Sequence, residues 1–380
     1  MAYTCPHFGR CGGCQLLDVP YEEQLAQKQK KIESLMGRFC RPNAIWGMDE
    51  PLHYRHKVQA AVAAGPGGCI LTGTYEPHSH RLVPVEQCLL EHRGAAPIFA
   101  TLRRLAREFH LEPFDDRTGR GFLRHILLRF GWASGEVMAV LVTASPVFPG
   151  SKNFVRALRQ AHPEIVTVVQ SVNARRTSMV LGEQEKVLYG PGFIRDSLCG
   201  LTFRLSARSF YQINPPQTQR LYEAAVAAAN LTGRELVMDA YCGTGTIGLI
   251  AAAHAGQVLG VERSREAVRD AEANARRNGV RNIRFLCADA GEQMARWAAD
   301  ARRPDVVLLD PPRAGCSPQF LQALMHMGPK RAVYISCDPE TQARDLAVLC
   351  DAYRVTGLQP VDLFPHTRHI ECIAALEKRM

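Results

Sequence analysis

A cysteine stands where an expected strand gives way to an expected helix. Residues 333–339 read Val-Tyr-Ile-Ser-Cys-Asp-Pro, so Cys337 follows a strand and precedes a helix with Pro339 in its first turn. A thiolate is a strong nucleophile, and a helix N-terminus lowers a thiol pKa. Most free cysteines are small buried hydrophobes, but this position favours Cys337 as a nucleophile.

A second group of reactive side chains lies near the C-terminus. Residues 364–371 read Phe-Pro-His-Thr-Arg-His-Ile-Glu and supply His366, His369 and Glu371 at the last expected strand. Any of the three can act as a general base. A surface turn explains the same run equally well, so the residues alone leave its role open.

A glycine-rich turn indicates a bound cofactor. Within residues 237–248, Gly243, Gly245 and Gly248 satisfy G-x-G-x-x-G between an expected strand and an expected helix, although a structural turn can share this pattern. The next strand ends in Glu262, whose carboxylate can accept hydrogen bonds from ribose hydroxyls. Together they predict a cofactor that contains adenosine.

The choice between NAD and S-adenosylmethionine depends on a further motif. Residues 308–313 read Leu-Leu-Asp-Pro-Pro-Arg at the end of the fourth strand. The rigid prolines hold Asp310 at the carboxyl edge of the sheet, where doubly wound folds bind ligands. A strand-terminal Asp-Pro-Pro is typical of methyltransferases, so S-adenosylmethionine is favoured and an NAD oxidoreductase is the weaker alternative.

A cysteine cluster at the N-terminus predicts a metal site. Cys5, Cys11 and Cys14 give C-x5-C-x2-C, with glycines beside the close pair. The chain has thirteen cysteines and no export signal, so reduced thiols are expected rather than disulfides. Spacing alone chooses neither zinc nor iron–sulfur, nor a fourth ligand among Cys40, Cys69, Cys88 and nearby histidines.

The elements that position these residues change character along the chain. We expect a cysteine-cluster region at 1–95, a central α+β region at 96–200 and a cofactor domain at 201–380. The first contains a basic helix from 22 to 38, and the second a helix at 97–109 and strands at 122–130 and 137–142. In the third, strands and helices alternate, which predicts an α/β fold with a parallel, doubly wound, Rossmann-like sheet. The expected strands are 235–241, 258–262, 283–288, 305–309 and 332–335, and the expected helices are 245–255, 264–278, 291–303, 317–327 and 339–350.

Composition limits the cellular setting. Apolar residues make up 46% and charged residues 22% of the 380 residues, and no run is long enough to span a membrane. The N-terminus has no secretory pattern, so we expect a cytoplasmic protein. The formal charge of +9 favours a polyanionic partner such as nucleic acid. The sequence indicates no obligate protein partner.

Motifs spread over nearly the whole chain resemble the bacterial RNA uracil-5-methyltransferase family. In chain order they are Ser209-Phe210-Tyr211-Gln212-Ile213-Asn214-Pro215, Asp239-Ala240-Tyr241-Cys242-Gly243, Asp310-Pro311-Pro312-Arg313-Ala314-Gly315, Ser336-Cys337 and Phe364-Pro365-His366-Thr367. The resemblance implies that Gln212, Tyr241, Glu262 and Asp310 contact S-adenosylmethionine. It also implies that Cys337 is the nucleophile and Glu371 the base, and Asp289 is a candidate neighbour of the adenine. The family's usual phenylalanine is a tyrosine at position 241, which preserves aromatic packing.

The implied chemistry explains why a cysteine and a base are both needed. Uracil C5 is a poor nucleophile, so a thiolate must first add at C6 to create an enolate. After methyl transfer a base must remove the C5 proton before the thiolate leaves. The resemblance assigns these two tasks to Cys337 and Glu371, with His366 and His369 as the next candidates for the base.

The cysteine motif resembles the ribosomal-RNA branch of that family. With a later cysteine in the context Val85-Glu86-Gln87-Cys88, it implies a [4Fe-4S] cluster on Cys5, Cys11, Cys14 and Cys88, and 23S rRNA as the substrate. Because the chain begins four residues before Cys5, we expect no N-terminal TRAM domain. Phosphate contacts are then expected from basic residues of the first 130 positions, namely Lys28, Lys30, Lys31, Arg55, Lys57, Arg120, Arg124 and Arg129.

Three other functions remain open. Transfer RNA is the first alternative substrate. An RNA cytosine-5 methyltransferase also uses a thiolate, but its signature has Pro-Cys where this chain has Pro312-Arg313. A non-catalytic iron–sulfur protein that binds RNA is the third, and cofactor binding without methyl transfer would support it.

Overall fold

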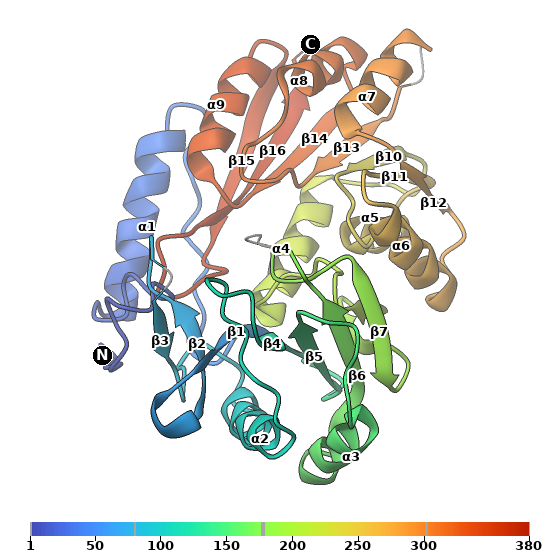
Figure 1. Ribbon diagram of the computed structural model, residues 1–380. Coiled ribbons are helices and arrows are strands. Elements are labelled where there is room, and N and C mark those ends of the chain that lie inside the picture. Colours follow the sequence, from blue (N-terminus) through green and yellow to red (C-terminus); the bar gives the residue numbers. More distant parts are fainter. Residues whose placement is uncertain (1, 80, 176–178, 301–302, 380) are drawn as a thin grey trace.

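The computed structural model describes residues 2–79, 81–175, 179–300 and 303–379, and a large sheet lies in each half of the chain (Figure 1). The first sheet has the order β3-β2-β1-β4-β5-β6-β7 and is antiparallel except for the β5/β6 pair. Its strands are β1 (Lys57–Ala64), β2 (Ile70–Tyr75), β3 (Leu82–Pro84), β4 (Leu123–Phe130), β5 (Val137–Thr143), β6 (Ile165–Val172) and β7 (Gln184–Tyr189). The boundary expected at residue 95 therefore falls inside one sheet.

Two helices cover the first sheet. They are α2 (Ala95–Glu108) and α3 (Ser151–Ala161), and a short 3-10 turn occupies Pro66–Gly68. Ile98 and Phe154 of these helices are buried in one apolar core with Ile126 and Leu141 of the strands. The α3 crossover is what allows β5 and β6 to run parallel, because parallel neighbours need a long connection.

The second sheet has the order β12-β11-β10-β13-β14-β16-β15. Its strands are β10 (Leu236–Ala240), β11 (Gln257–Glu262), β12 (Ile283–Cys287), β13 (Val306–Leu309), β14 (Arg331–Ser336), β15 (Tyr353–Val361) and β16 (Glu371–Lys378), and its helices are α5 (Thr246–Ala252), α6 (Arg265–Arg277), α7 (Ala290–Ala299), α8 (Pro318–Met327) and α9 (Pro339–Leu349). The predicted α/β fold with a Rossmann-like sheet is observed, with β12, β11, β10, β13 and β14 all parallel. The all-parallel arrangement is wrong at one edge, because β16 is antiparallel to both β14 and β15.

Local signals placed the helix ends well. Ser264 caps α6 by accepting a hydrogen bond from the amide of Ala267, and Gly279 beyond its C-terminus has a φ of +66°. The expected helix at 291–303 is observed as far as Ala299, and residues 301–302 lie outside the described ranges. Among the helices of those ranges, none is both long and apolar enough to cross a membrane.

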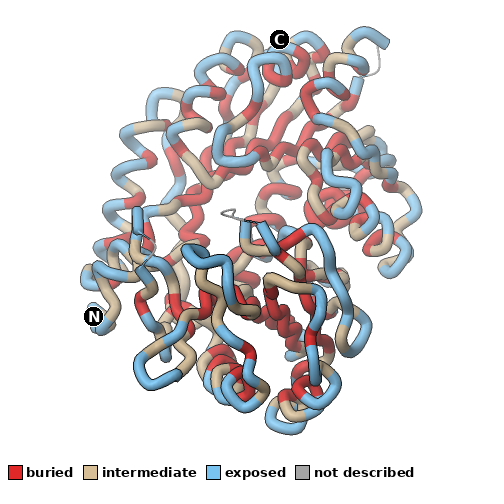
Figure 2. Tube along the Cα trace, viewed as in Figure 1, coloured by how far each residue is buried: buried red, intermediate tan, exposed pale blue. Residues whose placement is uncertain are grey.

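The two halves share a core. The hairpin β8 (Phe193–Leu198) and β9 (Leu201–Ser206) and the helix α4 (Pro215–Ala228) lie between the sheets in sequence. Phe203 of the hairpin is buried in one cluster with Met138 of the first sheet and Val237 of the second. Figure 2 shows this buried interior running through both sheets.

The N-terminal helix α1 (Tyr21–Met36) lies beside α9 in the C-terminal half (Figure 1). Ile32 and Met36 are fully buried in the same core as Phe320 and Leu346. The helix that the sequence placed in the cysteine region is therefore part of the cofactor domain's packing.

Candidate active site

The glycine-rich turn after β10 depends on unusual backbone angles. Gly243 and Gly245 have φ values of +54° and +81°, and Tyr241 is also left-handed at +65°. A Cβ on Gly248 would lie 2.7 Å from a carboxylate oxygen of Asp239, which accepts the Gly248 amide at 2.8 Å. These contacts hold the turn open at the end of the strand. Asp239 has this role, which the sequence motif did not reveal.

Two further carboxylates lie at the ends of β11 and β12. Glu262 at the end of β11 accepts the amides of Gly243 at 3.1 Å and Ser264 at 2.7 Å. Asp289 caps α7 by accepting the amides of Gly291 and Glu292. A carboxylate has about four acceptor positions, so each retains lone pairs for a ligand.

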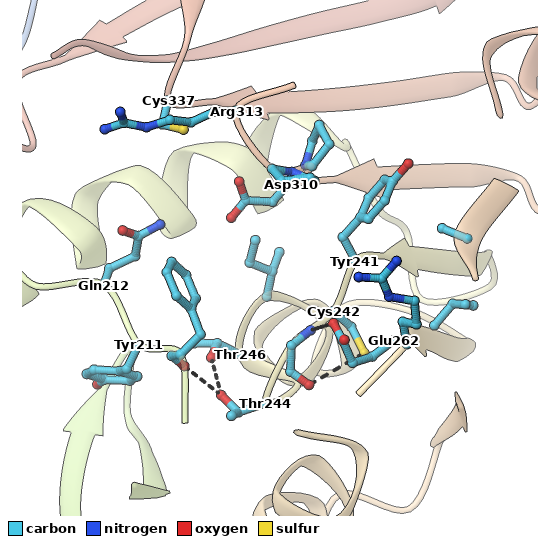
Figure 3. Close-up of a pocket in the computed structure, with 18 of the residues that line it drawn as sticks. Tyr211, Gln212, Tyr241, Cys242, Thr244, Thr246, Glu262, Asp310, Arg313 and Cys337 are labelled. Atoms are coloured by element: carbon cyan, nitrogen blue, oxygen red, sulfur yellow. Dashed lines mark hydrogen bonds between the residues drawn. The ribbon is translucent and has the colours of Figure 1, made fainter. Parts of the chain in front are cut away.

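A cavity of about 690 Å³ opens at the carboxyl edge of the second sheet. Its lining includes every residue that the sequence assigned to cofactor or catalysis: Gln212, Tyr241, Glu262, Asp289, Asp310, Cys337 and Glu371. In Figure 3, Cys337 and Arg313 lie at one end of the pocket, Glu262 lies toward the other, and Asp310 lies between them. This volume matches small-molecule sites in general.

Cys337 and Glu371 come together through strand register. Ser336, the last residue of β14, pairs with Cys372 of β16, so the next residue outward on each strand is Cys337 and Glu371. Glu371 is 1% exposed, and within the described part of the chain neither of its carboxylate oxygens has a hydrogen-bond partner. A buried polar group without a partner costs free energy. We therefore expect this carboxyl to interact with a ligand bound in the cavity.

The pKa values reflect crowding of acidic groups in a partly dry pocket. Burial raises the pKa of Glu371 well above its usual range, with a further increase from Asp310. Burial raises the pKa of Asp310 to about 7. Burial also raises the pKa of Cys337 to about 11; Glu371 and Asp310 add to this, and Arg313 opposes it. A helix N-terminus lowers a thiol pKa, but burial and the two carboxyls raise that of Cys337 overall.

The two histidines of the C-terminal run lie in different surroundings. His366 is fully buried against the rings of Tyr3 and Tyr21, and it is not part of the cavity lining. His369 lies 3.3 Å from the guanidinium of Arg313. This geometry argues against His366 as an alternative base. Arg313, which sequence reasoning read only as part of the Asp-Pro-Pro motif, lies beside the thiol in Figure 3 and lowers the pKa of Cys337.

The four cysteines expected as metal ligands gather near one another. Burial raises the pKa of Cys14 to about 12; Arg55 opposes this, and Cys88, Cys11 and Cys5 add to it. All four are free thiols, and Arg55 donates to the carbonyl of Gly13 at 3.0 Å. Across the described ranges, however, no three His, Cys, Asp or Glu side chains enclose a metal position. The thiols are therefore close together without forming a closed ion site.

Several basic residues expected to contact phosphates are buried. Lys28 pairs with Asp362, Arg124 binds Asp116 and backbone carbonyls, and Arg129 donates to the carbonyl of Ser209. The expected phosphate contacts of these three residues are wrong, because each side chain is buried and bonded to a partner inside the protein. Lys30 and Arg120 are exposed, so their side chains remain accessible.

Comparison with known proteins gives consistent results. Residues 182–379 match the family model described as tRNA (uracil-5-)-methyltransferase. RNA methyltransferases of Halalkalibacterium halodurans and Caldanaerobacter subterraneus, whose names do not specify which RNA, are 43% and 39% identical over 98% of this chain and 82% and 84% of theirs. The Pyrococcus abyssi tRNA (uracil-54, C5)-methyltransferase, solved with S-adenosyl-L-homocysteine, superposes with a TM-score of 0.80 at 26% identity, over 97% of this chain and 86% of that one.

Proposed function

The chain belongs to the tRNA (uracil-5-)-methyltransferase family, and from that premise we propose that it methylates C5 of a uridine in 23S rRNA. It is an RNA methyltransferase of the S-adenosylmethionine-dependent class. The observation that carries the proposed mechanism is the register of β14 and β16, which brings the Cys337 thiol beside the unpartnered Glu371 carboxyl in the cavity.

Cys337 and Glu371 act in sequence. The Cys337 thiolate forms a bond to C6, and the electron pair moves to make C5 nucleophilic. C5 would then bond to the methyl carbon of S-adenosylmethionine as that carbon's bond to sulfur breaks and its electron pair stays on sulfur, which leaves both a hydrogen and a methyl on C5. The Glu371 carboxylate accepts the C5 proton, the released electron pair restores the C5–C6 double bond, and the C6–S bond breaks to return the thiolate. Glu371 must therefore be deprotonated when it acts.

The charges of the pocket support that cycle. Arg313 opposes the rise in pKa of both Cys337 and Glu371, so it favours the anionic form of each. S-adenosylmethionine supplies an electrophilic methyl group on a positively charged sulfur. In our assignment Glu262 accepts hydrogen bonds from the ribose, while Gln212, Tyr241 and Asp310 line the remainder of the cofactor site. A uridine must leave its stack to reach Cys337, which favours a loop or bulge over duplex.

The N-terminal thiols suit a metal cluster chemically. Cys5, Cys11, Cys14 and Cys88 supply four thiol ligands within electrostatic reach of one another, and Arg55 adds a compensating cation beside them. Thiolate sets of this kind hold [4Fe-4S] clusters. In this proposal the cluster would tie the N-terminal segment to the Cys88 loop, and Cys40 and Cys69 would not be ligands.

The cluster has a direct test. Protein purified without oxygen should carry about four irons per chain. Cys88→Ser should lose the metal, whereas the matched changes Cys40→Ser and Cys69→Ser should retain it. One zinc and no iron, or iron that survives Cys88→Ser, would refute the assignment.

Transfer RNA is the second candidate substrate. The cysteine motif resembles the ribosomal branch, which supports 23S rRNA. The Pyrococcus abyssi enzyme, whose name gives tRNA uracil-54 as its target, is the observation that favours tRNA.

Methylation assays on 23S rRNA fragments and on unmodified tRNA separate the two substrates. We expect 5-methyluridine in the ribosomal fragments, with activity that falls steeply as salt increases. Efficient methylation of tRNA with none in 23S rRNA would overturn the substrate. S-adenosylmethionine binding without methylation of either RNA would support the non-catalytic alternative.

A further inference from the structure

The turn that delivers Glu371 is held by the opposite end of the chain. Residues 362–370 connect β15 to β16 and lead directly into Glu371. The amides of Gln15 and Leu16 both donate to the carbonyl of His366, at 3.0 and 3.1 Å. The hydroxyl of Tyr54 donates to the carbonyl of Pro365 at 2.9 Å. Residues near the N-terminus thus hold the backbone of this turn through several hydrogen bonds.

Lys28 of α1 fixes the start of the turn. Its ammonium donates to Asp362 at 2.6 Å and to the carbonyl of Phe364 at 3.3 Å, and both charged side chains are almost fully buried. Tyr21 donates to the second oxygen of Asp362 at 2.9 Å. A buried charge that loses its partner is strongly destabilised, so this pair holds α1 and the turn in one arrangement.

Gln24 of α1 fixes the middle of the turn. Its amide oxygen accepts the backbone amide of His366 at 3.0 Å, and its amide nitrogen lies 3.0 Å from the His366 ring. The same nitrogen donates to the carbonyls of Leu16 and Val19, both at 2.8 Å, which fixes the orientation of Gln24. His366 has a φ of +65°, a conformation that a non-glycine residue keeps only when its surroundings enforce it.

Glu371 depends on this support because its own side chain has none. Within the described ranges its carboxylate oxygens have no hydrogen-bond partner, so the backbone on either side determines where they lie. On the C-terminal side that backbone belongs to β16, and on the N-terminal side it is the turn held by α1. We propose that Gln24 and Lys28 are positioning residues for Glu371, acting through this turn. The inference rests on the proposed role of Glu371 as the base.

The step that should respond follows from the mechanism. Cys337 lies between β14 and α9, outside the turn, so thiolate addition and methyl transfer should depend on the turn less than removal of the C5 proton does. Removal of the C5 proton depends on the turn, because the turn positions Glu371 and Glu371 accepts that proton. Disturbing Gln24 should therefore slow release of RNA from Cys337 while methyl transfer continues, and an RNA–protein adduct should accumulate.

Gln24→Ala tests the proposal, with Gln27→Ala as its control. Gln27 has the same side chain on the same helix but is exposed. The probe is whichever RNA the wild-type enzyme methylates in the assays above. In single-turnover reactions, Gln24→Ala should transfer the methyl group within about twofold of wild type and release the adduct about 10- to 100-fold more slowly. Gln27→Ala should match wild type in both steps.

A reference variant separates the failure of this inference from failure of the mechanism. Glu371→Gln should trap the adduct on a denaturing gel. If it does not, the assignment of the base fails. If Glu371→Gln traps the adduct but Gln24→Ala releases it at the wild-type rate, or slows both steps equally, only the positioning role is overturned.

A second variant covers the case in which Gln24→Ala does not fold. Gln24→Glu keeps an acceptor for the His366 amide and loses the donor to Leu16 and Val19. It should show adduct release slower than wild type but faster than Glu371→Gln, with unchanged binding of S-adenosylmethionine. Wild-type release kinetics in a folded Gln24→Glu protein would overturn the proposal.

Discussion

The turn at residues 362–370 and the pocket beside it treat buried polar groups in opposite ways. In the turn, Asp362 binds both Lys28 and Tyr21, and the backbone of His366 is bonded through its amide and its carbonyl. In the pocket, Glu371 is equally buried and, among the described residues, its carboxyl has no partner. In the turn the polar groups are paired and stabilise the fold, whereas in the pocket one polar group stays available for a substrate.

This difference separates the groups that stabilise the fold from the group available for function. A satisfied buried network contributes to rigidity, whereas an unsatisfied buried group destabilises the protein and persists only where something else requires it. The two regions are consecutive in the chain, so a rigid turn supports a reactive end. Substitutions in the turn should therefore act mainly on stability, and substitutions in the pocket should act mainly on turnover.

The largest effect is expected in the pocket. Cys337→Ala should reduce methyl transfer by about 10⁴-fold or more, because the C6 adduct can no longer form. Affinity for S-adenosylmethionine, measured by calorimetry, should change by less than about twofold. Turnover near that of wild type would remove Cys337 from the mechanism.

The next effect is expected in the turn and concerns stability. Lys28→Met leaves Asp362 buried without its cation, so unfolding free energy should fall by about 3–5 kcal/mol. Urea unfolding followed by circular dichroism measures this loss. Lys30→Met, on an exposed position of the same helix, should stay within about 0.5 kcal/mol of wild type. Equal effects of the two changes would contradict the comparison.

Glu371→Gln should make the protein more stable at neutral pH. Burial raises the folded-state pKa of Glu371 above its unfolded value, so wild-type stability is complete below the unfolded pKa and declines as pH rises from the unfolded pKa toward the folded pKa. Glutamine does not titrate, so the variant should be more stable than the wild type near pH 7. Thermal unfolding at pH 4 and pH 7 should show the gap only at the higher pH. A loss of stability at pH 7 would mean that the carboxylate has a partner in solution.

The smallest effect concerns the thiol. With a pKa raised to about 11, Cys337 in the cofactor-free protein should react with iodoacetamide about tenfold faster for each pH unit between 7 and 10. Arg313→Gln should move the midpoint upward by up to about one pH unit, because the opposing cation is lost. Peptide mass spectrometry of the labelled Cys337 gives the rate. A midpoint below pH 8 in the free enzyme would show that the helix N-terminus dominates after all.

The sequence by itself determined the local machinery. Gly243 and Gly245, the prolines after Asp310, and Cys337 between a strand and a helix all depend on backbone geometry set by near neighbours in the chain. Helix ends such as Ser264 and Gly279 were predictable for the same reason. Periodicity and capping depend on residues that are close in sequence, so they can be predicted without knowledge of the fold.

Only the tertiary structure decided what those residues meet. The antiparallel β16 brings Glu371 beside Cys337, and Lys28 finds Asp362 across 334 positions of sequence. Composition counted Lys28, Arg124 and Arg129 as charges for a phosphate backbone, yet each is buried on an internal partner. The pKa of Cys337 rises for a related reason, because burial and the carboxyls of Asp310 and Glu371 act through space. Burial and charge pairing are long-range quantities, and a single sequence records the groups without recording which of them will face each other.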